Sequence, residues 1–173
     1  MIERQPAASP AARFADALTA LAAGVTLVTL ADGRDDIGTT VSAFCPLSVE
    51  PPLISVALQA GSYPAEVLAR LDWFAVTLLA ASQRALAGRF AASGRPGARL
   101  LLEGVPHQRG SHSGALIPDG GLAALECAAT QRIPAGDHLM VVAEVLALPY
   151  VAETGDPLVR FRSRYRPLSP APA

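Results

Sequence analysis

Short β-rich segments follow one another along this chain without a helix between each successive pair. Strand-like runs occupy residues 25–30, 37–44, 53–58, 73–79, 122–133, 138–148 and 158–162, whereas helical spacing is confined to 14–22, 64–71 and 82–92. A doubly wound parallel sheet needs a crossover helix between successive strands, so it fits this pattern poorly. The pattern favours a mainly β protein, an antiparallel barrel with a few inserted helices.

Turn and cap residues divide the chain further. Gly24 suits a helix C-cap, Pro51 and Pro52 interrupt the β-rich pattern, and Ser82 is predicted to cap the helix over 82–92. The stretch 106–118 is predicted to be a polar loop. Residues 1–13 and 169–173 are rich in Ala and Pro, so we expect flexible tails around one domain over 14–168.

Composition supports a folded domain. The 173 residues are 51% hydrophobic and 17% charged, which allows a substantial core and is not typical of disorder. No apolar run approaches the roughly 20 residues that cross a bilayer. The N-terminus lacks the charged-then-apolar pattern of a secretory signal, so we expect a cytoplasmic protein with no membrane partner.

The charges limit the chemistry. A net charge of −1 and a pI near 6.3 do not favour a nucleic-acid partner. All 14 basic residues are Arg, so lysine Schiff-base chemistry is excluded and an anion must be held by guanidinium, hydroxyl or backbone N–H groups. Cys45 and Cys127 are too few for a disulfide scaffold, and the three histidines are too scattered to predict a metal site.

Several catalytic motifs are missing. The sequence contains no GxGxxG fingerprint, no phosphate-binding P-loop, no HExxH and no GxSxG. If the chain is an enzyme, a bound organic cofactor is therefore the expected source of its chemistry.

Four motifs, in a fixed order, resemble one known family. Residues 24–29 read Gly-Val-Thr-Leu-Val-Thr, 38–44 read Gly-Thr-Thr-Val-Ser-Ala-Phe, and 51–53 read Pro-Pro-Leu. These three runs together form the first motif, and the other three motifs lie at 74–91, 135–146 and 157–166. The chain thus resembles the flavin reductase-like family over about 14–168.

This resemblance implies an FMN-binding split β-barrel that pairs as a homodimer, with the flavin at the subunit interface. It also implies an NAD(P)H-dependent flavin reductase, in which nicotinamide passes a hydride to FMN or FAD. Members of such a family often supply reduced flavin to a separate monooxygenase, which would be a partner here.

The resemblance places the flavin beside Thr39, Thr40, Val41, Ser42 and Ala43. A flat ring with a polar edge suits an extended backbone with small side chains, and the hydroxyls of Thr40 and Ser42 could serve the ribityl chain. Cys45 could face the flavin edge. The alternative is an ordinary half-buried strand with Thr and Ser on its wet face and a structural thiol.

The phosphate end is less regular. Gln59, Ser62 and Tyr63 precede a helix whose N–H groups suit a phosphate, although Pro64 stands where the family has a hydroxyl. Ser62 could equally be a simple cap. The segment containing Arg89 and Phe90 could supply positive charge and cofactor contacts, or Arg89 could be a solvated helix residue. Tyr165 could stack near the cofactor or cover the barrel end.

His138, after Gly136 and Asp137, is the candidate catalytic residue. The resemblance places it on the nicotinamide side of the flavin, where an imidazole could bind the carboxamide or manage a proton. The alternative is a turn histidine bonded to Asp137. His107 and His112 are weaker candidates for any role.

Two other functions stay open at this point. Departures from the family pattern at Pro46, Gln59, Pro64 and Ala143 allow a non-catalytic flavin-binding or redox-sensing module. A barrel that has lost flavin and serves as an interaction scaffold is the other. The sequence does not choose FMN over FAD or NADH over NADPH.

Overall fold

The computed structural model describes residues 9–33, 35–166 and 168, and the rest of the predicted tails, 1–8 and 169–173, lie outside them. The helical elements are α1 (Pro10–Leu18), α2 (Tyr63–Leu68), η1 (Ala81–Gln83), α3 (Arg84–Ala91) and α4 (Ala98–Leu101). The strands are β1 (Ala23–Gly24), β2 (Thr26–Asp32), β3 (Asp35–Val41), β4 (Phe44–Ser48), β5 (Leu53–Gln59), β6 (Trp73–Leu78), β7 (His107–Arg109), β8 (Leu116–Pro118), β9 (Ala123–Ala135), β10 (His138–Val151), β11 (Val159–Phe161) and β12 (Arg164–Arg166). The predicted mainly β class is confirmed.

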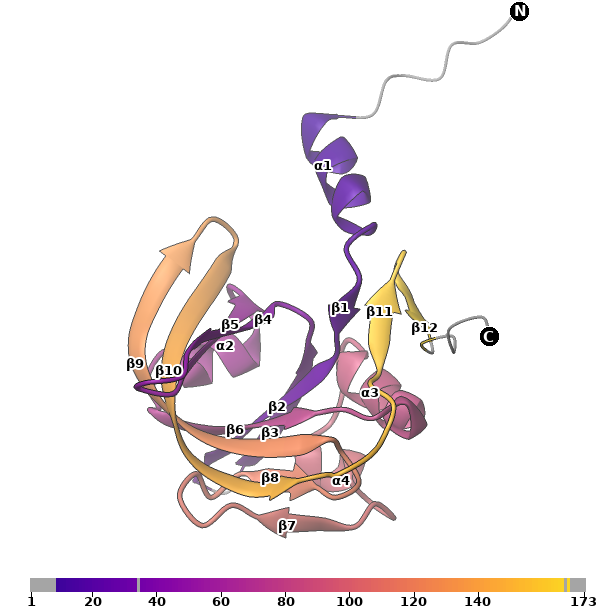
Figure 1. Ribbon diagram of the computed structural model, residues 1–173. Coiled ribbons are helices and arrows are strands. Elements are labelled where there is room, and N and C mark those ends of the chain that lie inside the picture. The colour runs from indigo at the N-terminus through magenta and orange to yellow at the C-terminus, as the bar shows by residue number, and fades with distance from the viewer. Residues whose placement is uncertain (1–8, 34, 167, 169–173) are drawn as a thin grey trace, which may run out of the picture.

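The main sheet has seven antiparallel strands in the order β3-β2-β6-β9-β10-β5-β4. Its two edge strands, β3 and β4, are consecutive in the chain and are joined only by Ser42 and Ala43. The Ala57 N–H donates to the Ala43 carbonyl at 2.9 Å, so the link lies against β5. The sheet therefore curls until its two edges meet at this link (Figure 1).

Two features project from the same side of the curled sheet. The long hairpin of β9 and β10 extends past its neighbours, and register shifts along it allow the strands to bend. Helix α1 stands clear of the body (Figure 1) and has no buried residue. Its Ser9 cap and Pro10 start it four residues earlier than the predicted Phe14.

Two apolar cores lie on opposite faces of β2 and β3. One fills the inside of the curled sheet and includes Val28, Val56 and Phe74. The other lies between the sheet and helices α3 and α4, and it includes Leu27 and Phe90. The small sheet β1-β11-β12 closes the second core.

Three local predictions are wrong. Gly24 is not a helix C-cap, because α1 ends at Leu18 with Thr19 as its cap and Gly24 lies in β1. Ser82 does not cap α3, because the chain first makes the short turn η1 and Gln83 stands at the start of α3.

The stretch 106–118 is not a loop but the hairpin β7–β8. Its turn is held by the buried Glu126 carboxylate, which accepts from the backbone N–H groups of His112 and Ser113 at 2.9 and 2.7 Å. That carboxylate comes from β9, so the local sequence gave no sign of it.

Among the described residues, no helix is long and apolar enough to span a membrane.

Candidate active site

Ser42 and Ala43 belong to neither β3 nor β4 and are exposed. Among the residues that the structure describes, no carbonyl accepts a hydrogen bond from either backbone N–H. The Ala43 carbonyl is held by β5, so the link is fixed against that strand. Small side chains and unpaired donors allow a flat, polar-edged ligand to approach this backbone closely.

Three predicted residues lie on one face of the neighbouring strands. Gln59 of β5 is directly opposite His138 of β10, and Cys45 of β4 is opposite Ser55 of β5. Side chains alternate between faces along a strand, and Val56 points into the core. Cys45, Gln59 and His138 therefore share the outer face, beside the Ser42–Ala43 link. Segments far apart in the sequence meet here.

His138 makes one side-chain interaction at this face. Its Nδ1 lies 2.7 Å from the Asp137 carboxylate, and its side chain is 43% exposed. The hydrogen bond with His138 and its charge lower the pKa of Asp137. The pairing predicted as the turn alternative is therefore present. It leaves Nε2 of the ring directed away from Asp137, so both roles are compatible with the geometry.

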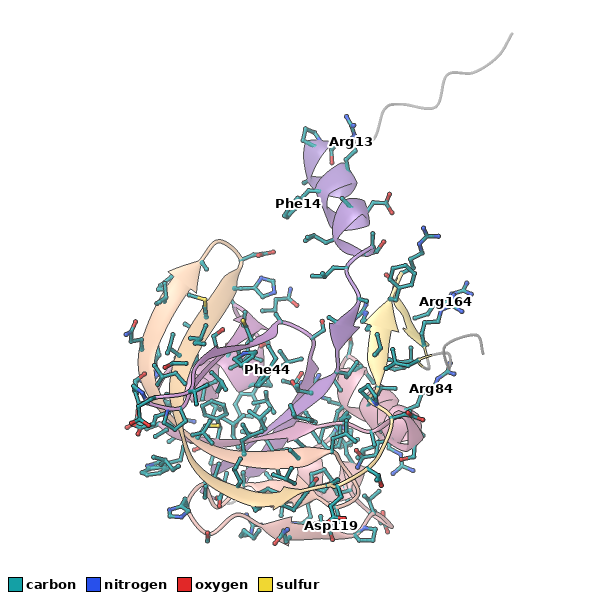
Figure 2. All side chains as sticks on the ribbon, in the orientation of Figure 1. Arg13, Phe14, Phe44, Arg84, Asp119 and Arg164 are labelled. Carbon is teal, nitrogen blue, oxygen red and sulfur yellow. The ribbon has the colours of Figure 1, made fainter. Side chains whose placement is uncertain are left out.

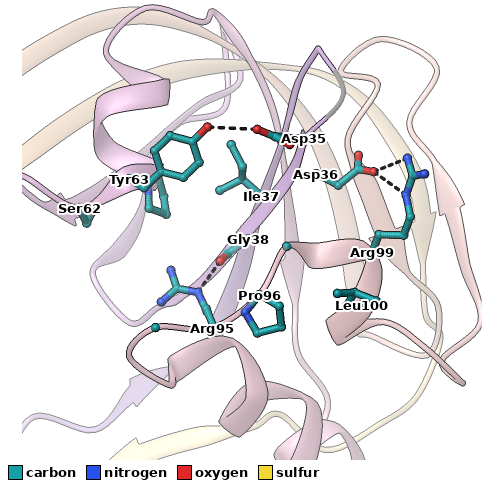
Figure 3. A pocket seen from close by; sticks show the side chains of 13 residues that line it. Asp35, Asp36, Ile37, Gly38, Ser62, Tyr63, Arg95, Pro96, Arg99 and Leu100 are labelled. Atoms are coloured by element: carbon teal, nitrogen blue, oxygen red, sulfur yellow. Dashed lines mark hydrogen bonds and ion pairs between the residues drawn. The ribbon is translucent and has the colours of Figure 1, made fainter.

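A hollow of about 620 Å³ lies at the other end of β3, and Figure 3 shows its walls. Ser62 and Tyr63 form one wall, with the Tyr63 hydroxyl 3.5 Å from Asp35. Ser62 also caps α2, accepting from the Ala65 N–H at 3.4 Å. The hollow, called here the β3 pocket, is lined by Asp35, Asp36, Ile37, Gly38, Ser62, Tyr63, Pro64, Gly94, Arg95, Pro96, Gly97, Arg99 and Leu100.

Arg95 is the residue of this pocket that sequence reasoning missed. Its Nε donates to the Gly38 carbonyl at 2.8 Å and its Nη1 to the Ala92 carbonyl at 3.2 Å. No carboxylate pairs with it among the described residues. Burial lowers the pKa of this guanidinium, which marks a desolvated positive charge without a counter-ion. An anion in the β3 pocket would supply one (Figure 3).

Arg89 and Phe90 do not line this pocket. Arg89 is exposed and donates to the Leu101 carbonyl at 3.2 Å, which ties α3 to α4. Phe90 is 0% exposed, and a Cβ on Gly38 would overlap its ring. The motif glycine is thus needed for packing against Phe90. The prediction that Phe90 contacts a cofactor is corrected: its ring supports β3 from the core side.

Asp36 clamps the far wall of the β3 pocket. Its carboxylate is 4% exposed and accepts from Arg99 at 2.8 Å and from Arg109 at 2.9 Å. Burial opposes the ionised form, but the two arginines outweigh burial and lower the pKa of Asp36. The clamp joins β3 to α4 and β7, so the pocket wall is fixed by charge as well as by packing.

The remaining predicted residues divide between faces. Thr39 is opposite the core residue Val28, and Val41 is 5% exposed, so both face inward and offer only backbone to a ligand. Thr40 is opposite Leu27 and so lies on the face of the second core. Tyr165 of β12 is half-buried against the second core, opposite Arg160.

The curled antiparallel sheet is that of a split barrel, with an open backbone link at one end of β3 and, at the other end, a pocket in which Arg95 has no carboxylate partner among the described residues. The chain belongs to the family of proteins with a flavin reductase like domain, whose model matches residues 18–169. The predicted family and split-barrel fold are thereby confirmed.

Three similar proteins illustrate the family. The chain is 37% identical to the reductase component of 4-hydroxyphenylacetate 3-monooxygenase of Thermus thermophilus, over 90% of this chain and 95% of that one. It is 32% identical to an NADH-dependent FMN reductase of Streptomyces nodosus subsp. asukaensis, over 90% and 83%. The NADH:FAD oxidoreductase of Streptomyces globisporus, solved with NAD and FAD fragments, superposes with a TM-score of 0.86 at 27% identity, covering 96% of this chain and 99% of that one.

Proposed function

We propose that this chain is an NAD(P)H-dependent flavin reductase that supplies reduced FMN or FAD to a partner monooxygenase. The observation that carries this is the meeting of Cys45, Gln59 and His138 on one face beside the unpaired N–H groups of Ser42 and Ala43. The described residues would hold the two ligands together, where a bound nicotinamide would supply a hydride to flavin N5 and solvent the accompanying proton.

The described residues fit an extended flavin. Within β3 the chain advances about 10 Å from Gly38 to Val41 at strand rise, and the Ser42–Ala43 link follows directly. Arg95 at one end would hold the phosphate, and the N–H groups at Ser42 and Ala43 would meet the polar edge of the ring.

His138 would hold the nicotinamide in place. With Nδ1 engaged by Asp137, Nε2 is the ring atom available to the carboxamide of the co-substrate. Orienting the nicotinamide over the flavin converts a bimolecular hydride transfer into one between fixed partners. Asp137 is a positioning residue that sets the ring's orientation and tautomer.

A second copy of the chain would complete the site. The outer face that carries His138 also carries the half-buried Met140 and Val142, and Ile133 is opposite Met140 with 37% exposed. Covering this face would exclude water from the flavin. Phe14 on the projecting α1, 64% exposed, offers a further apolar contact (Figure 2). We therefore propose a homodimer. Met140→Asp should convert the dimer to monomers in sedimentation analysis, and the monomers should lose flavin binding.

The partner is proposed from the relatives. One is named as the reductase component of a 4-hydroxyphenylacetate monooxygenase and another as that of a 4-nitrophenol monooxygenase. A monooxygenase that uses reduced flavin made elsewhere is the matching class of partner.

The first test is consumption of NADH and NADPH with added FMN or FAD, alongside flavin binding followed by flavin fluorescence. We expect flavin-dependent oxidation. Tight flavin binding without NAD(P)H oxidation would instead indicate a flavin-binding or redox-sensing module, and absence of flavin binding would indicate a scaffold.

His138→Ala tests the site itself. We expect kcat to fall by roughly 100-fold while the Kd for flavin changes little, because the imidazole acts on the nicotinamide. Asp137→Asn should give a smaller loss of kcat, since it alters only the orientation and tautomer of the ring. A His138→Ala variant that loses flavin affinity but keeps kcat would contradict the role.

A further inference from the structure

A second hollow, of about 320 Å³, lies between the end of α1 and the turn that joins β11 to β12. One wall is apolar, with Leu18 and Leu21, and the opposite wall carries Arg160 and Arg162. Its lining residues are Ala15, Leu18, Thr19, Leu21, Ala23, Ser42, Ala43, Arg160, Arg162 and Ser163. We call it the α1 pocket.

The positive charge of the α1 pocket is unbalanced. No acidic residue is among its lining residues. Within the described part of the chain, neither Arg160 nor Arg162 forms an ion pair. The Arg162 guanidinium stacks over the Phe161 ring at 5.3 Å, which leaves its N–H donors open. Two guanidinium groups beside an apolar wall suit a ligand that is anionic at one end and planar and apolar at the other.

The cationic wall is held in place by the backbone. The Arg162 N–H donates to the Thr19 carbonyl at 2.7 Å, which ties the turn to the end of α1. Arg162 and Ser163 both have positive φ, 48° and 58°, as a tight hairpin turn requires. The turn is therefore positioned by two strands and one helix end.

The α1 pocket adjoins the proposed flavin ring. Ser42 and Ala43, whose unpaired N–H groups were assigned to the polar edge of the ring, are also lining residues of this pocket. The phosphate end of the flavin is assigned to the β3 pocket, at the far end of the strand. A ligand in the α1 pocket would thus touch the reacting end of the flavin.

We propose that the α1 pocket binds the phosphate-bearing part of the nicotinamide co-substrate, with Arg160 and Arg162 on its phosphates and the α1 wall against its adenosine. This rests on the proposed function. The pyrophosphate of FAD has the same chemistry, so the experiment separates the two sources.

The test compares two double variants of one hairpin. Arg160→Gln with Arg162→Gln removes the charges that line the pocket, whereas Arg164→Gln with Arg166→Gln removes the same charge from neighbouring positions outside it. With FMN as the flavin, the first variant should raise KM for NADH or NADPH at least about tenfold, since charged hydrogen bonds are lost. The control should leave KM near the parent value.

Two further measurements decide the source. Inorganic pyrophosphate should compete with NADH, and its Ki should rise about tenfold in the pocket variant only. Kd values for FMN and FAD should stay unchanged in both variants. If the Arg160→Gln, Arg162→Gln variant binds FAD more weakly but binds FMN and has a KM for NADH as in the parent, the proposal is overturned. The α1 pocket would then bind the pyrophosphate of FAD.

The proposal for the α1 pocket is also overturned if the two double variants have the same KM for NADH or NADPH. If the parent protein binds flavin but does not oxidise NAD(P)H, the proposed function fails. In that case, calorimetry with pyrophosphate still tests whether the α1 pocket binds an anion. If pyrophosphate does not bind, the α1 pocket is not an anion site.

Discussion

The two hollows at the two ends of β3 hold their arginines in different ways. In the β3 pocket, Arg99 is matched by the buried Asp36, and Arg95 is anchored to two backbone carbonyls. In the α1 pocket, Arg160 and Arg162 have no acidic neighbour among the lining residues, and one wall is a helix with no buried residue. Figure 2 shows Arg84 and Arg164 on the same outer edge.

This difference indicates different ligands. A pocket whose walls are clamped to the core suits a group that must be held in a fixed position, such as the flavin phosphate. A pocket with open charge on exposed elements suits a co-substrate that enters and leaves in each cycle. We therefore expect the flavin phosphate to be held rigidly at one end of the site and the co-substrate to exchange at the other.

The largest effect should come from breaking the clamp. Asp36→Ala removes four hydrogen bonds from a side chain that is 4% exposed, and we expect a loss of about 2 kcal/mol in the free energy of unfolding. Both arginines stay largely exposed, which keeps the loss below that of a fully buried pair. Urea denaturation measures it. Arg160→Gln with Arg162→Gln should stay within about 0.5 kcal/mol of the parent, and equal losses would erase the distinction.

Arg95→Ala tests the phosphate end directly. We expect the Kd for FMN to rise about tenfold, because a partly buried charged donor is lost, while riboflavin, which lacks the phosphate, binds as before. Arg89→Ala is the matched control, since its guanidinium bonds Leu101 away from the pocket. If Arg89→Ala loses FMN affinity and Arg95→Ala does not, the phosphate is bound by Arg89, as the sequence analysis allowed.

Acid should weaken the clamped region selectively. The pKa values of Asp36 and Glu126 are lowered from 3.8 and 4.5 in the folded chain, so both carboxylates stabilise it above those values and lose this contribution as pH falls through the folded pKa values. The free energy of unfolding should drop below about pH 4. The drop should be shallower in Asp36→Asn, and an identical slope would show that the clamp does not contribute.

The smallest effect concerns the turn of the α1 pocket. Ser163 has a φ of 58°, a region that costs little only for glycine. Ser163→Gly should raise the free energy of unfolding by up to about 1 kcal/mol, or a few degrees in Tm. Gly155→Ala is the opposite control, because its φ of 141° is rare for L residues and the change should destabilise.

Much of the fold was readable from local pattern. The strands around Val28, Val56 and Val76 were predicted because alternating or β-branched runs bounded by Gly and Pro are strong signals. The β7–β8 hairpin and α4 were missed because their residues are polar or few, and they are held by Asp36 and Glu126 from distant strands. Long-range carboxylates leave no trace in a local window.

The candidate site was likewise predictable in part, where local motifs carry the signal, and unpredictable where distant contacts decide. His138, Gln59 and Cys45 were named from motif resemblance, and sheet register then brought them onto one face. Arg95 was overlooked because its significance is the absence of a counter-ion, which no sequence displays. Phe90 was misassigned because its motif position reflects packing against Gly38 rather than contact with a ligand.

The sequence by itself determined the family, the mainly β class and the reliance on arginine for any charged contact with an anion, because these depend on residue type and order. The tertiary structure decided which arginines are free to make that contact. Pairing depends on which carboxylates the curled sheet brings within hydrogen-bond distance. Asp36 reaches Arg99 and Arg109, while Arg95, Arg160 and Arg162 form no ion pair with a described carboxylate.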